Sequence, residues 1–483
     1  MSRHEPAVEP IADVSSLELS GERMRALVDA TMERLVVFIE TLSQQPSYDD
    51  EGAAEMARSL IEPLPERGRP YQELLELLFE KVIPKGFGTG TPGYLGYIPG
   101  GGIFHSAVAD LIADSVNRFT SIWLPAPGLA QIEAVVVRWL CEIVGYPRQA
   151  GGILTTGGSM ANFSALVTAR RERLPEDFLA GTIYVSDQVH HSLQKSAMLA
   201  GFPAANVREI PSDEQYRLRM DLLESKIIED RDAGFTPFFI VANAGTVNTG
   251  AVDDLEGVAD VAERQGLWLH MDAAYGGFFL LTERGRKVLA GIGRADSIVL
   301  DPHKGMFLPY GTGSLLVRDG TALERAHAVD AGYLPTMQQD PDFVDFSEIS
   351  PELSRDHRGL RLWLPVKMHG IEAFRRNLDE KLDLARWATG ELRKIDGIEI
   401  VAEPQLSLVA FRLVRPGLDA EQLNRLNRAL IDGINLRKRV FLSGTVLDGS
   451  FLLRICVLSF RTHMDRMREG LEDIRAAVAA VAG

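Results

Sequence analysis

The chain has 483 residues, of which 46% are hydrophobic and 24% charged, a composition typical of globular proteins rather than disordered or fibrous ones. Its formal net charge of −16 disfavours nonspecific binding to nucleic acid or to anionic membranes. No segment offers the roughly 18 uninterrupted apolar residues of a membrane span, and the first residues lack the apolar core of a signal peptide. These features favour an enzyme that acts on a small molecule.

Apolar residues recur at steps of three and four between about residues 20 and 44. This spacing predicts an amphipathic helix with one wide apolar face. We expect residues 1–85 to form an N-terminal helical segment whose apolar face covers the main body or a partner subunit. A plainer interpretation, a helix packed within its own small domain, stays open.

The stretch GTGTPG at residues 88–93 matches the G-x-G-x-x-G fingerprint of dinucleotide-binding folds. That fingerprint requires a strand before it and a helix after it. Here a helical pattern precedes the glycines, and the segment YLGYIPGGG follows them. We therefore interpret this stretch as a turn-rich entrance loop rather than a nicotinamide site.

From about residue 130, helical segments alternate with short β-rich runs: TIYVSD (182–187), FFIVANAG (238–245), LWLHMDAA (267–274), SIVLD (297–301) and GSLLVR (313–318). Such alternation predicts β-α units and a mostly parallel sheet, that is, an α/β fold. A long helical stretch and further β-rich runs then predict a small C-terminal α+β domain. The expected division is a large domain over residues 86–370 and a small one over 371–483.

Two cysteines, Cys141 and Cys456, lie in the apolar contexts VRWLCEIVG and LLRICVLSF. Apolar surroundings favour buried, reduced thiols over disulfides or metal ligands. The cysteines therefore predict a cytoplasmic protein, and we expect no metal site.

The segment GGILTTGGSMANFSALVTARR has the arrangement of a phosphate-binding loop, because an apolar run ends in TTGGS and a helix starts at about Met160. Ser159 can cap this helix, and the amide groups and dipole of its first turn favour an anion. A capped helix start is common, however, so the loop alone does not establish a phosphate site.

Three chemically distinctive residues each follow a predicted strand: Lys304 after SIVLDPH, Asp272 in HMDAAYGG, and His190 in SDQVHHS. Strand ends of α/β proteins face the crevice where ligands bind. A phosphate anchor, a lysine that can bond to an aldehyde and a carboxylate for a pyridine nitrogen are what pyridoxal phosphate requires. We therefore predict this cofactor.

The motifs GGSMANFSAL, SDQVHHS, NAGTVNTGAVDD, HMDAAYGG and DPHKG occur in the order and spacing of a known family. The chain resembles the pyridoxal-phosphate-dependent group II amino-acid decarboxylases, most nearly the aromatic-L-amino-acid decarboxylases. The resemblance implies the aspartate-aminotransferase fold (fold type I) and a carboxy-lyase that converts an L-amino acid, expected to be aromatic, into an amine and carbon dioxide. It also implies a homodimer with the active site at the subunit interface.

By this resemblance, Lys304 holds the cofactor covalently and Asp272 stays ionised against the protonated pyridine nitrogen. His190 stacks on the ring, and the alternative that His190 or its neighbour His191 is only a polar loop residue stays open. The remaining cofactor contacts implied by the resemblance are Gly158, Ser159 and His303 at the phosphate, Ala274 on the ring and Thr246 near the ring substituents.

The chain departs from the aromatic decarboxylases at four positions, which carry Asp301 in place of asparagine, Gly305 in place of tryptophan, Gly100 in place of threonine and Ser121 in place of phenylalanine. A carboxylate beside a phosphate is repelled unless it is protonated or turned away. The expected set of phosphate ligands therefore excludes Asp301.

The segment AVDAGYLPTMQQDPDFVDFSEIS resembles the family's mobile lid, and Tyr333 matches the lid tyrosine that returns a proton to the α-carbon. The resemblance therefore favours decarboxylation. An aldehyde synthase, a carbon–carbon lyase, an aminotransferase or an inactive relative on the same scaffold stays open, as does a Tyr333 that only packs the lid.

The expected substrate residues, also implied by the resemblance, are Tyr97, Phe119, Ser121 and Ser354. Ser354 falls where plant relatives carry serine for phenolic substrates. Together these residues favour a side chain of the phenylalanine, tyrosine or dihydroxyphenylalanine type.

Overall fold

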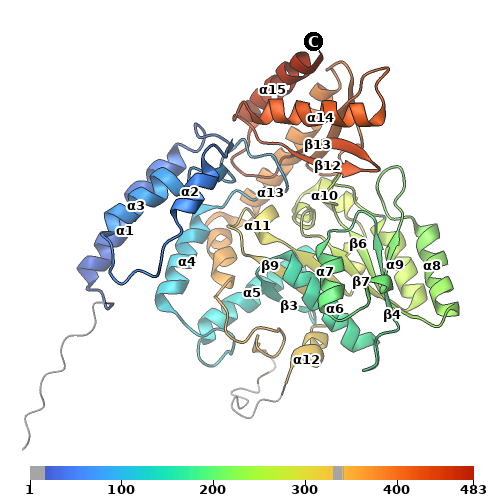
Figure 1. Ribbon diagram of the computed structural model, residues 1–483. Coiled ribbons are helices and arrows are strands. Elements are labelled where there is room, and N and C mark those ends of the chain that lie inside the picture. The colour runs from blue at the N-terminus through green and yellow to red at the C-terminus, as the bar shows by residue number, and fades with distance from the viewer. Residues whose placement is uncertain (1–16, 330–339, 341, 483) are drawn as a thin grey trace, which may run out of the picture. The chain divides into compact units, whose positions relative to one another are not determined.

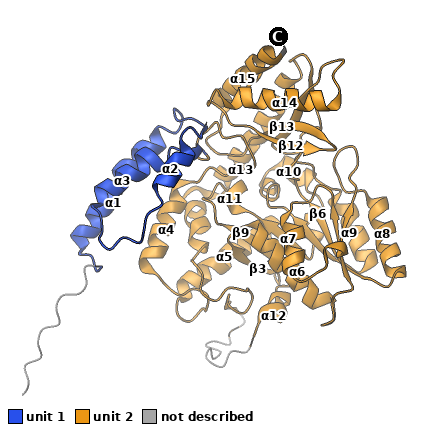
Figure 2. Cartoon of the chain, in the orientation of Figure 1, with its two compact units in different colours: residues 1–88 blue, residues 89–483 orange. Residues whose placement is uncertain are grey.

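The computed structural model describes residues 17–329, 340 and 342–482. The chain divides into two compact units, Met1–Gly88 and Thr89–Gly483, coloured separately in Figure 2. In the ranges that the structure describes, no helix combines the length and the apolar character needed to cross a bilayer.

The first unit is built from helices α1 (Gly21–Glu40), α2 (Ala53–Ser59) and α3 (Tyr71–Glu76), a π-helix (Leu77–Val82) and the antiparallel strands β1 (Tyr48–Asp49) and β2 (Gly86–Phe87). Helix α1 confirms the predicted amphipathic helix. It begins after Ser20, whose hydroxyl accepts a hydrogen bond from the Arg23 amide at 3.2 Å. None of its residues is fully buried.

The second unit contains a seven-stranded sheet in the order β3-β9-β8-β7-β6-β4-β5 (Figure 1). Its strands are β3 (Gly151–Thr155), β4 (Gly181–Ser186), β5 (Val207–Ile210), β6 (Thr236–Asn243), β7 (Trp268–Asp272), β8 (Ser297–Leu300) and β9 (Gly313–Val317). All neighbours pair in parallel except β9, which is antiparallel to both β3 and β8. The mostly parallel sheet confirms the prediction, whereas strand β5 was not predicted because VREI lacks a clear apolar run.

Helices cover both faces of this sheet. Apolar side chains of α6 (Gly158–Arg173), α7 (Ser192–Leu199) and α12 (Thr321–His327) pack on one face, and those of α5 (Pro127–Ile143), α8 (Met220–Asp232) and α9 (Leu255–Gln265) pack on the other. The other helices of this part are α4 (Phe104–Val116), α10 (Glu283–Val288) and α11 (Pro302–Gly305), with short 3₁₀ turns at Ala204–Asn206, Gly277–Leu281 and Ile292–Arg294.

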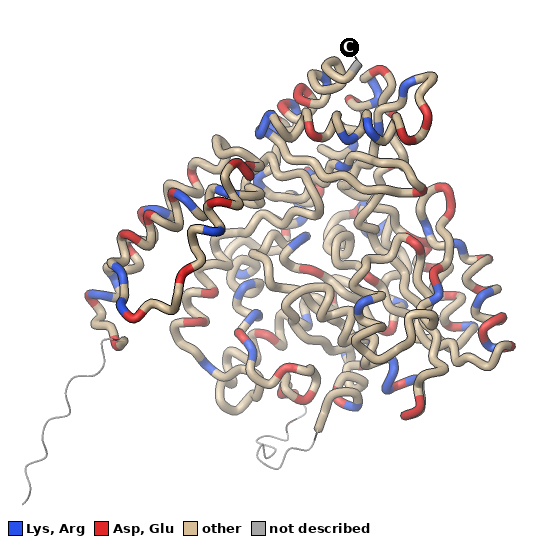
Figure 3. Tube along the Cα trace, viewed as in Figure 1, with Lys and Arg blue, Asp and Glu red and all other residues tan. Residues whose placement is uncertain are grey.

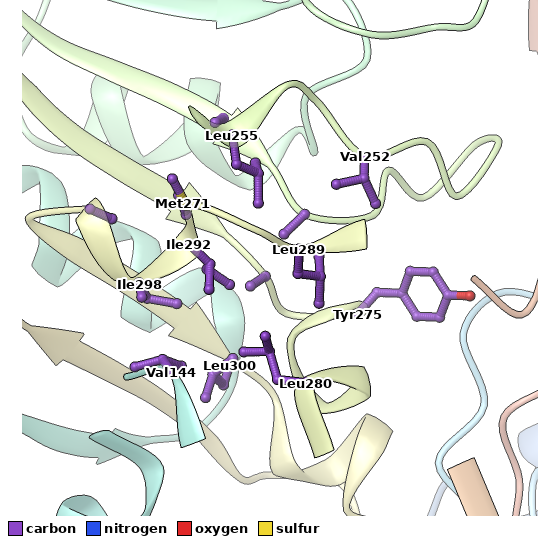
Figure 4. Packing of buried hydrophobic residues seen from close by; sticks show 14 of the residues in the cluster. Val144, Val252, Leu255, Met271, Tyr275, Leu280, Leu289, Ile292, Ile298 and Leu300 are labelled. Atoms are coloured by element: carbon purple, nitrogen blue, oxygen red, sulfur yellow. The ribbon is translucent and has the colours of Figure 1, made fainter. Parts of the chain in front are cut away.

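The strands explain why both faces are covered. Ile298 and Leu300 of β8 join Met271 of β7 in one apolar cluster, whereas Val299 joins the cluster on the opposite face. Figure 4 shows the first cluster from close by, with side chains of the two strands packed beside those of Leu280, Leu289 and Ile292. Because side chains alternate along a strand, a run such as SIVL must be covered on both sides.

The C-terminal part carries an antiparallel sheet in the order β10-β11-β13-β12, formed by β10 (Ile398–Ile400), β11 (Leu408–Leu413), β12 (Ser443–Leu447) and β13 (Ser450–Cys456). It shares an apolar core with α14 (Ala420–Asn435), α15 (Met464–Ala482) and the second half of α13 (Gly359–Leu392). Helix α13 is interrupted at Gly370, with φ 69° and ψ 161°, where the predicted boundary at residue 370 falls. The three-part division of the chain stays a prediction.

Charged residues are frequent along the outer helices, whereas few lie in the interior of the second unit (Figure 3). One ion pair is fully buried: it joins Glu133 of α5 to Arg355, and both side chains are 0% exposed. Arg355 and Arg358 also donate hydrogen bonds to the Leu154 carbonyl of β3, at 3.3 and 3.2 Å. The buried charges therefore hold the end of the strand that leads into the TTGGS loop.

Replacing Arg355 with methionine should lower the free energy of unfolding by about 3–5 kcal/mol, because Glu133 is left as a buried charge without its cation. The double variant Glu133→Leu/Arg355→Met should recover most of that loss. Chemical denaturation of the three proteins measures both effects. A double variant no more stable than the single one would contradict this account.

Candidate active site

The carboxyl ends of β3, β4, β6, β7 and β8 meet at one edge of the sheet and border a cavity of about 310 Å³. All eight residues predicted to contact the cofactor line this cavity: Gly158, Ser159, His190, Thr246, Asp272, Ala274, His303 and Lys304. The structure thus brings together residues that lie almost 150 positions apart in the chain.

The first turn of α6 forms a cradle at one end of the cavity. The helix begins at Gly158, two residues before the predicted start, and Gly157 occupies the N-cap without a side-chain hydrogen bond. The predicted capping role of Ser159 is therefore wrong, because glycine takes the cap and Ser159 lies within the first turn. A Cβ atom on Gly158 would stand 3.0 Å from Asp301 Oδ2, so the close approach favours glycine there.

Lys304 and Asp301 form an ion pair, with 2.8 Å between Nζ and Oδ2. Burial lowers the pKa of Lys304, but the neighbouring Asp301 carboxylate outweighs it and the net shift of the pKa is upward. Asp301 is 2% exposed, and its Oδ1 has no hydrogen-bond partner among the described residues. Asp301, where the aromatic decarboxylases carry asparagine, therefore lies between Lys304 and the α6 cradle.

His303 lies beside this pair. Its Nδ1 donates a hydrogen bond to the Thr312 carbonyl at 2.7 Å, and its Nε2 is 3.7 Å from Asp301 Oδ2. Burial lowers the pKa of His303, although Asp301 opposes the shift. Since Nδ1 carries the proton of the neutral ring, Nε2 becomes a donor only when the imidazole is charged.

Asp272 accepts hydrogen bonds on both carboxylate oxygens, from the Ala274 amide at 3.2 Å and from Asn162 Nδ2 at 3.1 Å. His190 Nδ1 lies 2.7 Å from Ser192 Oγ. Burial lowers the pKa of His190, and the attraction of Asp272 only partly offsets this. The cavity lining includes His190 and not His191.

Thr246 is buried, and its hydroxyl is engaged within a turn, 3.1 Å from the Thr249 hydroxyl and accepting from the Ala251 amide. Asn162 and Ser192 also line the cavity and were missed in the sequence. The sequence carries only weak signals that these two residues lie at the site. Asn162 lies three positions after Ser159 on one helix, and Ser192 lies two positions after His190, so spacing alone could have placed them nearby.

Unlike the predicted cofactor contacts, the four predicted substrate residues do not gather at the cavity. Tyr97 is 50% and Phe119 39% exposed, Ser354 is exposed, and Ser121 is buried. None of the four lines the cavity. The predicted proton donor Tyr333 lies outside the described residues.

Two further departures from the aromatic decarboxylases, at Gly100 and Gly305, have a packing explanation. A Cβ atom on Gly100 would lie 1.9 Å from the His303 carbonyl oxygen. A Cβ atom on Gly305 would lie 2.6 Å from Cβ of Phe278. Neither position has room for the larger residue that the resemblance leads one to expect.

The donor set fits pyridoxal phosphate. The glycine cradle at the start of a 16-residue helix suits a phosphate, Lys304 can bond to an aldehyde, and Asp272 can pair with a protonated pyridine nitrogen. Asp301, which also lines the cavity, does not suit the phosphate. Among the described residues, no group of three or more His, Cys, Asp or Glu is arranged to hold a metal ion.

Comparisons with known proteins agree with this chemistry. Residues 54–414 match the family "Pyridoxal-dependent decarboxylase conserved domain". An aromatic-L-amino-acid decarboxylase of Bacillus atrophaeus is 34% identical over 96% of this chain and 98% of its own. A phenylacetaldehyde synthase of Arabidopsis thaliana is 25% identical over 95% of this chain and 96% of its own.

Among solved structures, that of Oryza sativa TDC with PLP and tryptamine superposes with a TM-score of 0.91 at 25% identity, covering 96% of this chain and 99% of that one. The superposition confirms the predicted fold class. The family match and the relative that is 34% identical confirm the predicted cofactor and reaction class. The chain belongs to the pyridoxal-phosphate-dependent decarboxylase family and is a carboxy-lyase.

Proposed function

We propose that this enzyme decarboxylates an aromatic L-amino acid to the corresponding amine. The observation that carries the proposal is the convergence of Lys304, Asp272 and His190 on one cavity that ends in the α6 cradle. The aromatic preference is supported by the names of the matched relatives, among them aromatic-L-amino-acid, tryptophan and tyrosine decarboxylases.

Each residue has a distinct task in this proposal. Pyridoxal phosphate, when bound, would supply an electron sink for the loss of the α-carboxylate. Asp272 would accept a hydrogen bond from the protonated pyridine nitrogen and keep that nitrogen charged. The first turn of α6 and Ser159 would hold the phosphate. Lys304 would have to lose a proton before it could bond to an aldehyde, and the Asp301 carboxylate at 2.8 Å opposes this loss because it raises the pKa of Lys304.

We also propose a homodimer. Val108, Leu111, Ile112 and Val116 of α4 are 36–53% exposed and lie at helical spacing, so they form an apolar stripe that a second copy can cover. The exposed Tyr97 and Phe119 suit a substrate pocket completed at such an interface. Light scattering should give twice the 53.2 kDa mass of the chain.

We propose a cytoplasmic location as well. The free, buried cysteines Cys141 and Cys456 support it.

The function is tested by incubating the cofactor-loaded protein anaerobically with a panel of aromatic, acidic and basic amino acids. We expect carbon dioxide and a stoichiometric amine from phenylalanine, tyrosine, dihydroxyphenylalanine or tryptophan, identified by mass spectrometry. Release from glutamate alone would overturn the aromatic assignment. No release from any of them would overturn decarboxylation.

An aldehyde synthase is the second candidate, favoured by the phenylacetaldehyde synthase among the relatives. The proposal assigns Tyr333 as the acid that returns a proton to the α-carbon. Tyr333→Phe should therefore convert the main product from amine to aldehyde, with ammonia and peroxide and with oxygen uptake. Product analysis in air measures the ratio of aldehyde to amine. An unchanged amine yield would show that another group donates the proton.

Asp301→Asn should strengthen cofactor binding about tenfold, because the neutral amide removes a like charge beside the phosphate. The substitution also removes the carboxylate that raises the pKa of Lys304. Fluorescence titration of the cofactor-free protein measures the dissociation constant. Asp296→Asn, which changes a carboxylate before the opposite end of β8, is the matched control and should have no effect. Weaker binding by Asp301→Asn would mean that the carboxylate helps to hold the cofactor.

A further inference from the structure

A chain of buried hydrogen bonds runs beneath the cavity from Trp268 to Asp272. Trp268 Nε1 donates to Ser297 Oγ at 2.8 Å, and Ser297 Oγ lies 2.8 Å from His270 Nδ1. His270 Nε2 lies 2.9 Å from Asn162 Oδ1, and Asn162 Nδ2 donates to Asp272 Oδ2 at 3.1 Å. All five residues are buried.

The chemistry of its two ends sets the direction of every bond in this chain. The indole N–H of Trp268 can only donate, and an ionised Asp272 can only accept. The amide nitrogen of Asn162 must therefore face Asp272, and its oxygen must accept from His270 Nε2. Burial lowers the pKa of His270 to about 4, so the ring is neutral and its Nδ1 accepts from Ser297.

A branch leads from the same amide to His190. Asn162 Nδ2 donates its second hydrogen to Ser192 Oγ at 3.0 Å, and Ser192 Oγ lies 2.7 Å from His190 Nδ1. The backbone amide of Ser192 also points at His190 Nδ1, at 3.3 Å. Because this amide can only donate, Nδ1 is an acceptor and the proton of neutral His190 sits on Nε2.

We propose that Asn162 is a positioning residue that sets the charge of Asp272 and the tautomer of His190 together. Both hydrogens of its amide are used, one on each branch, and its oxygen is held by His270. Asp272 is thereby kept as an acceptor-only carboxylate, and His190 is kept neutral with Nε2–H as its single donor. This inference rests on the assignment of Asp272 and His190 to the cofactor site.

The His190 branch is tested by NMR of the cofactor-loaded protein labelled with ¹⁵N in its histidine rings, with His190→Gln to assign the signals. The wild type should show His190 as the neutral Nε2–H tautomer. In Ser192→Ala the pKa of His190 should rise toward its ordinary value of about 6.5, because the hydroxyl that donates to Nδ1 is lost.

Ser196→Ala, a buried serine one turn further along α7, is the matched control and should leave the His190 signals unchanged. An Nδ1–H tautomer in the wild type, or an unaltered pKa of His190 in Ser192→Ala, would overturn the branch. This readout needs no turnover, so it separates failure of the inference from failure of the proposed reaction.

The Asp272 branch is tested with Asn162→Leu, which keeps the approximate shape of the side chain and removes both donors. The pH midpoint of the cofactor absorption band should shift, and kcat should fall at least tenfold with a smaller change in KM. Ser192→Ala keeps the bond to Asp272 and should leave the absorption midpoint in place. An unshifted midpoint in folded, cofactor-loaded Asn162→Leu would show that Asn162 does not control Asp272.

Discussion

The active site depends on a single topological constraint, the common direction of five strands. Strands β4, β6, β7 and β8 pair in parallel, and β3 runs with them because the intervening β9 is antiparallel to both of its neighbours. Their carboxyl ends therefore meet at one edge, where loops can present polar side chains. Apolar clusters on both faces bury the sheet behind that edge.

Charge within the site is arranged so that every buried anion has a hydrogen-bond donor or a cation nearby. Asp272 is held by two N–H donors, and Asp301 is paired with Lys304. The difference between the two matters chemically. Asp272 is held by neutral donors, whereas the partner of Asp301 is the lysine that the proposed function assigns to the covalent bond with the cofactor.

The hydrogen-bonded residues beneath the cavity and the closely packed glycines leave little space for larger side chains. A side chain at Gly100 would collide with the His303 carbonyl, and one at Gly305 would collide with Phe278. These contacts explain why the chain carries glycine at both positions.

Much of the protein follows from local sequence. Runs such as SIVL and LWLHMD must be buried on both faces, which determines a parallel sheet between helices, and the motifs around Lys304, Asp272 and His190 determine the cofactor. The start of α6, the strands VREI and SGTVL, and the presence of Asn162 and Ser192 in the cavity lining were not predictable in the same way. A hydrogen bond between Asn162 and Asp272 joins residues 110 positions apart, and no local pattern encodes it. Only the position of α6 against the folded sheet decides which buried donor lies within hydrogen-bond distance of which acceptor, because a shift of a few tenths of an ångström can make or break such a bond.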